Sequence, residues 1–518
     1  MTYSGFPRTA YTLPDCLVSA RNGQPQRIAV VDENSRVSYD ELLDRVRRFA
    51  MLLRTSGIQR GDRVAIFLPR SYDAVTALFS LWFIGAVGVI INDVLRTRQV
   101  NYILEHAEVS LLVTNSRLLS SLENPSISSS RILLIDQVAL PGEGVTSSPT
   151  IGNDLALIIY TSGSTGMPKG IMLSHANLLA GAYIIADYLR LTEKDILISL
   201  LPFSFDYGLN QLLTAVLIGG TLIIEQSVLP AGICNTLLEE KVTGMAAVPM
   251  LWQQLAHPRW SPFTKRSFPS LRYLTNTGGR LPEPILRAFR KAHPKVDIYL
   301  MFGLTEAFRS TFLPPEEVDR HPTSIGRAIP NCEVFLLNEK GEPCKPGEVG
   351  EIVHRGATVS MGYWKDPKST AERFRPAPFQ GGRGGLPEIA VYSGDYATMD
   401  EEGFLYFIGR RDQMIKSHGM RVSPEEIEDC IFASGMAAHA VVLASPRTED
   451  ANDIVVAIVP HDPASFKSED LIEYSKREMP AYMRPDIVWP LERFPETSSG
   501  KPDRVRLKEM FEAQRKES

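Results

Sequence analysis

The sequence predicts an α/β protein with a large N-terminal domain of stacked βαβαβ sheets, a small β-rich subdomain and a small α+β C-terminal domain. Three observations lead to this fold class. β-Rich and amphipathic helical segments alternate through the first half of the chain, short strands between Gly and Pro turns follow at residues 327–406, and a new helix–strand pattern begins after Gly409. A length of 518 residues suits two to four domains.

Apolar residues in the first half recur with helical or strand-like spacing. The helix expected at residues 40–56 has one apolar stripe, and Gly57 can end it in a left-handed conformation. A second helix is expected at 72–83. Buried strands are expected at 27–33, 63–68, 111–114, 131–135 and 155–160. Strands that alternate with helices favour mainly parallel sheets.

The β-rich subdomain and the C-terminal part have different patterns. Short strands are expected at 334–337 and 351–354, and the glycine-rich residues 381–387 predict a loop. In the C-terminal part, Ser423 is expected to cap a helix as part of a capping box with Glu426, and Ser468 to cap another. Strands are expected at 440–444, 454–460 and 487–490. We place the domain boundary near Arg411–Asp412, which gives domains of residues 1–410 and 411–518.

Composition excludes several classes of protein. The chain has 55 Lys and Arg against 60 Asp and Glu, a formal net charge of −5, which argues against a polycationic binder of nucleic acid or anionic membrane. The N-terminus has no signal-peptide pattern, and the most apolar stretch, residues 81–91, is too short to span a bilayer. The five cysteines are an odd number, far apart and without a Cys-x-x-Cys, so we expect a reducing, cytoplasmic location.

The segment YTSGSTGMPKG at residues 160–170 is the sharpest local signal. It offers hydroxyls, glycines that let backbone N–H groups approach an anion, and the cation of Lys169. Such a loop after a strand is typical of triphosphate binding. A Ser/Gly linker rarely carries a lysine directly before an apolar segment. A Walker P-loop would continue as a helix, whereas residues 171–173 favour a strand.

Four further motifs follow this loop along the chain: FGLTE at 302–306, SGD at 393–395, GRRDQMIK at 409–416 and SGKPD at 499–503. In this order and spacing the five motifs resemble those of the adenylate-forming superfamily, which contains acyl-CoA synthetases, amino-acid adenylation domains and luciferases. The resemblance covers nearly the whole chain. Residues 302–329 look most like a bacterial, exosortase-associated branch of acyl-CoA ligases.

The resemblance implies a reaction in two steps. A carboxylate attacks the α-phosphate of ATP to give an acyl-adenylate and pyrophosphate, and a thiol then displaces AMP. The implied ATP-binding residues are Thr161, Ser162, Gly163, Ser164, Thr165, Gly166, Lys169, Phe302 near adenine, Asp395 on the ribose and Arg410 beside it. Thr305 and Glu306 resemble the phosphate contact and the Mg²⁺ ligand, and Lys501 resembles the catalytic lysine. Asp412 matches the hinge of a mobile C-terminal domain, and Gly419 the thiol channel.

The acyl pocket is expected near Phe205, Asp206, Trp252, Asn276, Thr277, Gly278 and Gly279. Asp206 supports two interpretations. Amino-acid-activating members of the superfamily have Phe-Asp here, and a buried carboxylate needs a cationic partner, which favours an amine-bearing acid. Alternatively, Asp206 caps a helix that begins near Tyr207.

The thiol acceptor is either CoA or the phosphopantetheine of a carrier protein, because both present the same pantetheine arm. Two other classes share the scaffold: a luciferase-like oxygenase and a catalytically inactive binding relative. The presence of the charged motif residues Lys169, Glu306, Asp395, Arg410 and Lys501 together opposes the inactive relative.

Overall fold

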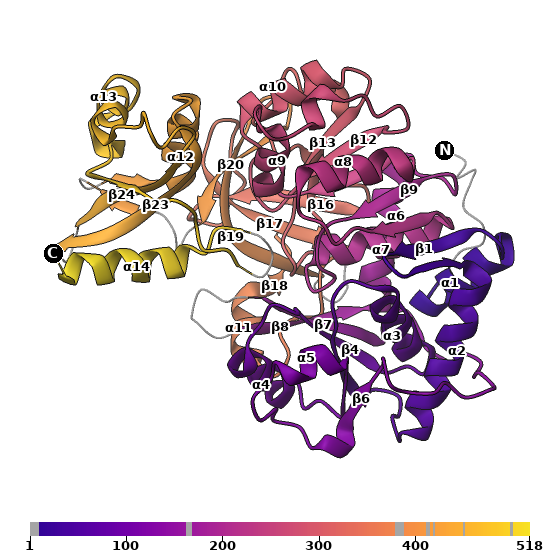
Figure 1. Ribbon diagram of the computed structural model, residues 1–518. Coiled ribbons are helices and arrows are strands. Elements are labelled where there is room, and N and C mark those ends of the chain that lie inside the picture. Colours follow the sequence, from indigo (N-terminus) through magenta and orange to yellow (C-terminus); the bar gives the residue numbers. More distant parts are fainter. Residues whose placement is uncertain are drawn as a thin grey trace.

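The computed structural model describes residues 10–161, 168–378, 388–410, 415–417, 420–448, 451–497 and 501–517 (Figure 1). The helices are α1 (Leu13–Gly23), α2 (Tyr39–Thr55), α3 (Tyr72–Phe83), α4 (Thr97–His106), α5 (Ser116–Ser120), α6 (His175–Tyr188), α7 (Asp206–Ile218), α8 (Pro230–Glu239), α9 (Pro249–Ala256), α10 (Glu283–Ala292), α11 (Pro367–Arg373), α12 (Pro424–Ala433), α13 (Ser468–Glu478) and α14 (Arg504–Glu517).

The first fifteen strands build the two large sheets. They are β1 (Ile28–Asp32), β2 (Ser35–Ser38), β3 (Arg63–Phe67), β4 (Val87–Ile91), β5 (Leu111–Thr114), β6 (Ile132–Leu134), β7 (Leu155–Thr161), β8 (Lys169–Ser174), β9 (Ile196–Ser199), β10 (Thr221–Ile224), β11 (Gly244–Ala247), β12 (Tyr273–Asn276), β13 (Asp297–Phe302), β14 (Thr311–Leu313) and β15 (Arg327–Ala328). One sheet has the order β6-β5-β3-β4-β7-β8, and the other β15-β14-β13-β12-β11-β9-β10-β1-β2. Most neighbours are parallel, as the alternation of helices and strands predicted.

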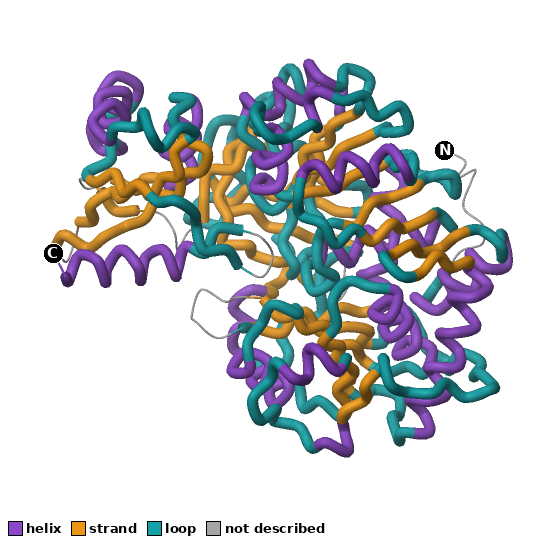
Figure 2. The backbone as a smooth tube through the Cα atoms, in the orientation of Figure 1, coloured by secondary structure: helices purple, strands orange, loops and turns teal. Residues whose placement is uncertain are grey.

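Three layers of helices enclose the two large sheets. The central layer contains α1, α2, α3, α6 and α7, whose apolar residues share one core with the inner faces of both sheets. Helices α8, α9 and α10 cover the outer face of the nine-stranded sheet, and α4 and α5 cover that of the six-stranded sheet. Figure 2 shows the resulting alternation of helices and strands. Strands buried on both faces explain the near-continuous apolar runs in the sequence.

The remaining strands form smaller sheets. They are β16 (Cys332–Leu337), β17 (Gly350–Gly356), β18 (Phe374–Pro376), β19 (Ile389–Met399), β20 (Leu405–Arg410), β21 (Ile415–Ser417), β22 (Met420–Val422), β23 (Ala437–Thr448), β24 (Ala451–Pro460) and β25 (Ile487–Pro490). Strands β16 to β20 build an antiparallel sheet, which is the predicted β-rich subdomain. The hairpin β21–β22 follows it, and β23, β24 and β25 form the last sheet.

The last sheet places its two faces in two separate cores. Val441 and Leu443 pack with Leu507 of α14, whereas Val442 lies on the other face with Ile427 of α12. This alternation follows from the period of two along a strand. Both cores contain only residues between 415 and 511, which agrees with the prediction of a separate α+β unit.

The structure modifies three local predictions. Ser423 Oγ accepts from the backbone N–H of Glu426, as a cap should, but it also donates to the carbonyl of Ile408, and the reciprocal half of the capping box is not formed. The prediction that Ser468 caps a helix is wrong, because α13 begins at Ser468 itself and Lys467 takes the cap position without a side-chain bond. The predicted loop at 381–387 and the boundary residues Arg411 and Asp412 lie outside the described residues.

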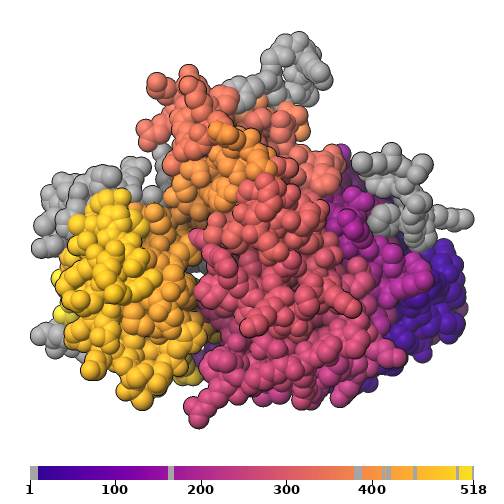
Figure 3. All heavy atoms as spheres, turned by 90° about the horizontal axis from the view of Figure 1, so that it is seen from above, coloured from indigo at the N-terminus to yellow at the C-terminus, as the bar shows by residue number. Residues whose placement is uncertain are grey.

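The C-terminal unit contacts the large domain through charged side chains. Arg280, just after β12, forms an ion pair with Asp429 of α12, and both side chains are about a third exposed (35% and 31%). Figure 3 shows the C-terminal residues in yellow beside the middle of the chain. The pair therefore stabilises this orientation of the two units. Within the described ranges, no helix is both long and apolar enough to cross a membrane.

We expect Arg280→Ala and Asp429→Asn to lower the population of this orientation by a similar factor. For a partly exposed ion pair the effect is about two- to fivefold. Small-angle scattering and single-molecule fluorescence between labels on α10 and α14 would measure it. The control is Arg287→Ala, which breaks an ion pair within α10 only. Equal behaviour of all three variants would show that the Arg280–Asp429 pair does not hold the units together.

Candidate active site

The carboxyl ends of neighbouring parallel strands carry most of the predicted site residues. Strand β9 leads to Phe205 and Asp206, β12 to Gly278, and β13 to Thr305 and Glu306. In open α/β sheets ligands bind outside this edge, because helix N-termini and loops converge there. The topology of the nine-stranded sheet thus brings together residues that lie far apart in the chain.

Asp395 and Arg410 are direct cross-strand neighbours on β19 and β20. The Arg410 Nε atom lies 2.9 Å from Asp395 Oδ1, and Asp395 is 1% exposed. Burial raises the pKa of the Asp395 carboxyl, and the Arg410 guanidinium opposes this shift. Neither Asp395 oxygen accepts a hydrogen bond from a described residue. Buried acceptors of this kind fit the two hydroxyls of a ribose.

Phe302, at the end of β13, packs beside these strands. Its ring centroid lies 5.5 Å from that of Phe407 on β20 and 6.3 Å from that of His354 on β17. Burial lowers the pKa of His354 to about 3, so the imidazole is neutral at pH 7. The residues around Phe302 therefore form an aromatic, uncharged surface that suits a purine ring.

Glu306 and Lys169 share a neighbour, Tyr363. The Tyr363 hydroxyl donates to Glu306 Oε1 at 2.7 Å, and Lys169 Nζ lies 5.1 Å from the Tyr363 ring centroid. Lys169 Nζ also donates to Ser369 Oγ at 2.7 Å and lies 3.9 Å from Asp366 Oδ2. Burial and the Glu306 carboxylate raise the pKa of the Tyr363 phenol, which keeps it a donor. Glu306 is held in place by this bond, with a second oxygen left for a cation such as Mg²⁺.

Lys501 reaches from the C-terminal unit into this group of residues. Its Cε atom lies 3.0 Å, and its Nζ atom 3.4 Å, from the position a Cβ would take on Gly278, and Nζ lies 5.4 Å from the Phe205 ring centroid. Burial and Arg410 lower the pKa of the Lys501 ammonium, whereas Asp206 and Asp395 raise it. The ammonium thus lies within the electrostatic reach of Asp206 on one side and of Asp395 on the other.

Asp206 has a cationic partner within the protein. Arg309 Nη1 lies 3.9 Å from Asp206 Oδ2, and the two side chains are 2% and 5% exposed. Burial raises the pKa of the Asp206 carboxyl, and Arg309 and Lys501 oppose this. The argument that Asp206 needs a substrate amine therefore loses its premise, because no sequence pattern indicates that Arg309 lies beside it. The capping alternative is also wrong, because α7 begins at Asp206 and Phe205 takes the cap position.

The remaining predicted pocket residues divide into two groups. Gly278 (φ +81°) and Gly279 lie in the turn after β12, where the Asn276 side chain donates to the Gly279 carbonyl at 2.9 Å. Trp252, by contrast, is 1% exposed and packs on Phe263 and Phe289 beneath the sheet, with its indole N–H donating to Ala247. The structure thus places Trp252 in the hydrophobic core, which corrects the expectation of a pocket-lining side chain.

Part of the predicted site lies outside the described residues: Ser162, Gly163, Ser164, Thr165, Gly166, Asp412 and Gly419. Thr161 is the last residue of β7 and pairs with Lys169 on β8, so the two strands fix both ends of the segment between them. Lys169 begins β8, as expected from the strand pattern after it.

Sequence analysis missed two residues of this site. Arg309 and Tyr363 lie outside the five motifs, and neither has charged or catalytic residue types in a recognisable spacing around it. Only the fold brings Arg309 against Asp206 and Tyr363 against Glu306.

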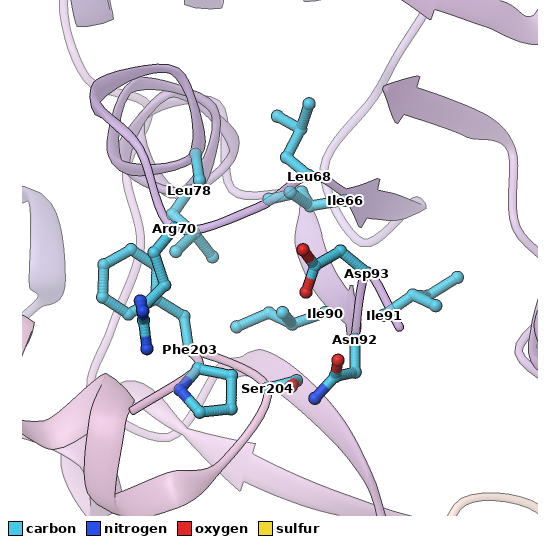
Figure 4. Close-up of a pocket in the computed structure, with 12 residues that line it drawn as sticks. Ile66, Leu68, Arg70, Leu78, Ile90, Ile91, Asn92, Asp93, Phe203 and Ser204 are labelled. Atoms are coloured by element: carbon cyan, nitrogen blue, oxygen red, sulfur yellow. The ribbon is translucent and has the colours of Figure 1, made fainter. Parts of the chain in front are cut away.

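A small internal hollow lies elsewhere, between β3, β4, α3 and residues 202–204 (Figure 4). Its volume of 10 Å³ is at the lower limit of the room that one water needs. None of the predicted site residues lines it, so it is not the acyl pocket.

Comparison with known proteins identifies the family. AMP-binding enzymes match residues 18–364, and the AMP-binding enzyme C-terminal domain matches residues 426–501. The chain belongs to the AMP-binding enzyme family. It is thus a member of the adenylate-forming superfamily, as the five motifs indicated. The exosortase-associated branch stays a prediction.

The curated relatives include multidomain peptide synthases and a protein of similar length to this chain. A linear gramicidin synthase of Brevibacillus parabrevis is 31% identical over 93% of the chain, which spans only 6% of that protein. The chain likewise spans 11% of gramicidin S synthase 2 of Aneurinibacillus migulanus, at 28% identity over 94% of the chain. Feruloyl-CoA synthase of Amycolatopsis sp is 30% identical, over 92% of this chain and 94% of that protein. The feruloyl-CoA synthase therefore has nearly the same extent as this chain.

Solved structures agree with this assignment. o-Succinylbenzoate CoA synthetase from Bacillus subtilis, in complex with its acyl-adenylate, is 26% identical and matches 95% of this chain and 97% of that one with a TM-score of 0.83. The same synthetase in complex with ATP and a magnesium ion matches with a TM-score of 0.82, at 26% identity over 95% of this chain and 99% of that one. The AMP-binding fold and its C-terminal domain are therefore both present in this chain.

We expect Gly278→Ala to slow adenylation by about ten- to a hundredfold, because a misplacement of about 1 Å at a reacting centre costs up to a hundredfold. The added methyl group would meet Lys501, and the positive φ would strain it. Pyrophosphate exchange measures the rate.

The matched control is Gly219→Ala, which has a similar φ of +68° but ordinary contact with Ala20. If Gly219→Ala slows exchange as much as Gly278→Ala does, backbone strain and not Lys501 explains the loss.

We expect Asp395→Asn to raise the KM for ATP by about ten- to a hundredfold, the cost of losing charge-assisted hydrogen bonds. Isothermal titration with ATP and with 2′,3′-dideoxy-ATP would test this. The wild type should prefer ATP, and the variant should bind the two alike. Glu401→Gln, in an exposed turn, serves as the control. An unchanged preference for ATP in Asp395→Asn would remove Asp395 from the ribose site.

Proposed function

We propose that this enzyme activates a carboxylic acid with ATP, releases pyrophosphate, and transfers the acyl group from acyl-AMP to a pantetheine thiol. The observation that carries the proposal is the position of Lys501, against Gly278 and between Asp206 and Asp395. An ammonium there lies where a carboxylate bound near Gly278 would meet a nucleotide bound at Asp395.

Each residue of the site has a defined task in the first step. Asp395 accepts the ribose hydroxyls, Phe302 faces the adenine, and Lys169 with the loop at 161–166 contacts phosphate oxygens. Glu306, with Thr305 beside it, would hold the Mg²⁺ that neutralises phosphate charge. Lys501 offsets the repulsion between the substrate carboxylate and the α-phosphate, which otherwise opposes the attack.

The second step needs the thiol to reach the same carbonyl carbon. Because Lys501 occupies that side of the site, the C-terminal unit must turn away first, and we propose Asp412 as the hinge and Gly419 as part of the thiol channel. The domain division at residues 410 and 411 belongs to this proposal. CoA is the simpler acceptor, since the chain has nearly the same extent as the feruloyl-CoA synthase.

An amino-acid adenylation enzyme that loads a carrier protein is the second candidate. Its support is the Phe205–Asp206 pair together with the similarity to peptide synthases such as the linear gramicidin synthase. The ion pair between Asp206 and Arg309 weighs against it, because a substrate ammonium would have to compete with a guanidinium. A cytoplasmic location is part of our proposal for both candidates.

We expect Lys501→Ala to reduce acid-dependent pyrophosphate exchange by about a hundred- to a thousandfold, the usual cost of removing a group that stabilises transition-state charge. Thioester formation from supplied acyl-AMP should stay within a fewfold of the wild type. Lys508→Ala, on the exposed face of α14, is the control. Equal loss of both steps would contradict this division of tasks.

A further inference from the structure

Arg309 has an edge of its guanidinium that no described residue satisfies. The side chain is 2% exposed, and its Nε and Nη2 atoms have no hydrogen-bond acceptor among the described residues. Its Nη1 atom is the one nearest Asp206, at 3.9 Å, and the guanidinium carbon lies 4.7 Å from the Tyr207 ring centroid. The cation is therefore fixed in position by an ion pair and an aromatic ring while two of its donors stay unused.

The two unused donors lie on the same edge of the guanidinium. The Nε–H and one Nη2–H bond point in parallel, and this side-on pair matches the two oxygens of a carboxylate. Buried donors without acceptors are costly, so a native site that keeps them usually presents them to a ligand. Asn210, one helical turn after Asp206 on α7, has a buried Nδ2 group that is likewise unpartnered among the described residues.

Charge decides between a second carboxylate and an amine on the substrate. Around Asp206 the cations are Arg309 and Lys501, and the other facing anion is Glu306. Lys501 and Glu306 have tasks in adenylation, which leaves Arg309 and Asp206 as the pair at the acyl end. A substrate ammonium would add a cation beside Arg309 and leave its two donors unsatisfied. A carboxylate would satisfy both donors at once.

Building on the function proposed above, we propose that the acid activated here carries a second carboxylate, received by the Nε and Nη2 donors of Arg309. Arg309 is thus a specificity-determining residue. Asp206 interacts with both Lys501 and Arg309, so the two carboxylates of the substrate are separated by a short chain. Asp206 then orients Arg309 through Nη1 and does not bind the substrate directly.

The first test compares matched acids in pyrophosphate exchange with the wild-type chain: succinate against butyrate, glutarate against valerate, and β-alanine and γ-aminobutyrate as amine-bearing acids. We expect the better diacid to exceed its monoacid by at least tenfold in kcat/KM. A monoacid or an amine-bearing acid that equals or exceeds the diacids would overturn the proposal while leaving the adenylation function intact. Failure of every acid to support exchange would count against the proposed function itself.

The second test uses variants of Arg309. Arg309→Met should lower kcat/KM for the preferred diacid at least tenfold through KM, while the monoacid of the same length is unchanged or improved. Arg309→Lys keeps the charge but loses the paired donors, and it should retain an intermediate preference. Equal loss for diacid and monoacid in both variants would show a structural role only and would overturn the proposal.

The matched control is Arg272→Met. Arg272 also pairs with a buried aspartate, Asp195, at 2.6 Å and lies over a tyrosine ring, but it belongs to the start of β12, at the opposite end of the strand. Its loss should leave the diacid preference unchanged. If Arg309→Met does not fold, as judged by circular dichroism, the Arg309→Lys comparison still decides the question, because it preserves the charge and the ion pair.

Discussion

The catalytic arrangement depends on a lysine ammonium that the C-terminal unit inserts beside a glycine of the large domain. Lys501 loses most of its hydration there, and burial alone would favour its neutral form. Asp206 and Asp395 oppose this loss, because each places a carboxylate within reach of the ammonium. Gly278 makes the approach possible, since a side chain at that position would occupy the path of the lysine stem.

The sheets explain how residues from distant parts of the chain meet at this point. Strands β9, β12 and β13 run in parallel and end at one edge of the nine-stranded sheet, so the turns that follow them carry Asp206, Gly278 and Glu306 to a common place. The antiparallel pair β19–β20 supplies Asp395 and Arg410 as cross-strand neighbours. The C-terminal unit has cores of its own, so it can deliver Lys501 as a body.

Buried charge gives the site its selectivity. Asp206 and Arg309 are both nearly inaccessible to water, and each compensates part of the other's desolvation. The unequal use of the guanidinium matters more than the pair itself, because one nitrogen faces Asp206 while the other edge has two donors that no described residue satisfies. In the same way, Tyr363 holds one oxygen of Glu306 and leaves the other for a cation.

The sequence by itself determined the fold class, most elements and the order of the motifs, because hydrophobic periodicity and turn residues act locally. Helix α3 and strands β5 and β25 have the predicted bounds, and Gly57 has the positive φ expected after α2. Family resemblance added the candidate roles of Lys169, Asp395 and Lys501. The position of Ser468 inside α13 shows that a residue type alone does not fix which of two adjacent positions begins a helix.

Only the tertiary structure decided which charges meet. Nothing near Asp206 in the sequence indicates Arg309 as its partner, and nothing near Glu306 indicates Tyr363, because these contacts cross between elements that the sheet order brings together. The same reason explains Trp252, whose residue type suits a pocket as well as a core until Phe263 and Phe289 surround it. Local patterns specify local structure, whereas the desolvation and pairing of charges depend on neighbours that folding alone supplies.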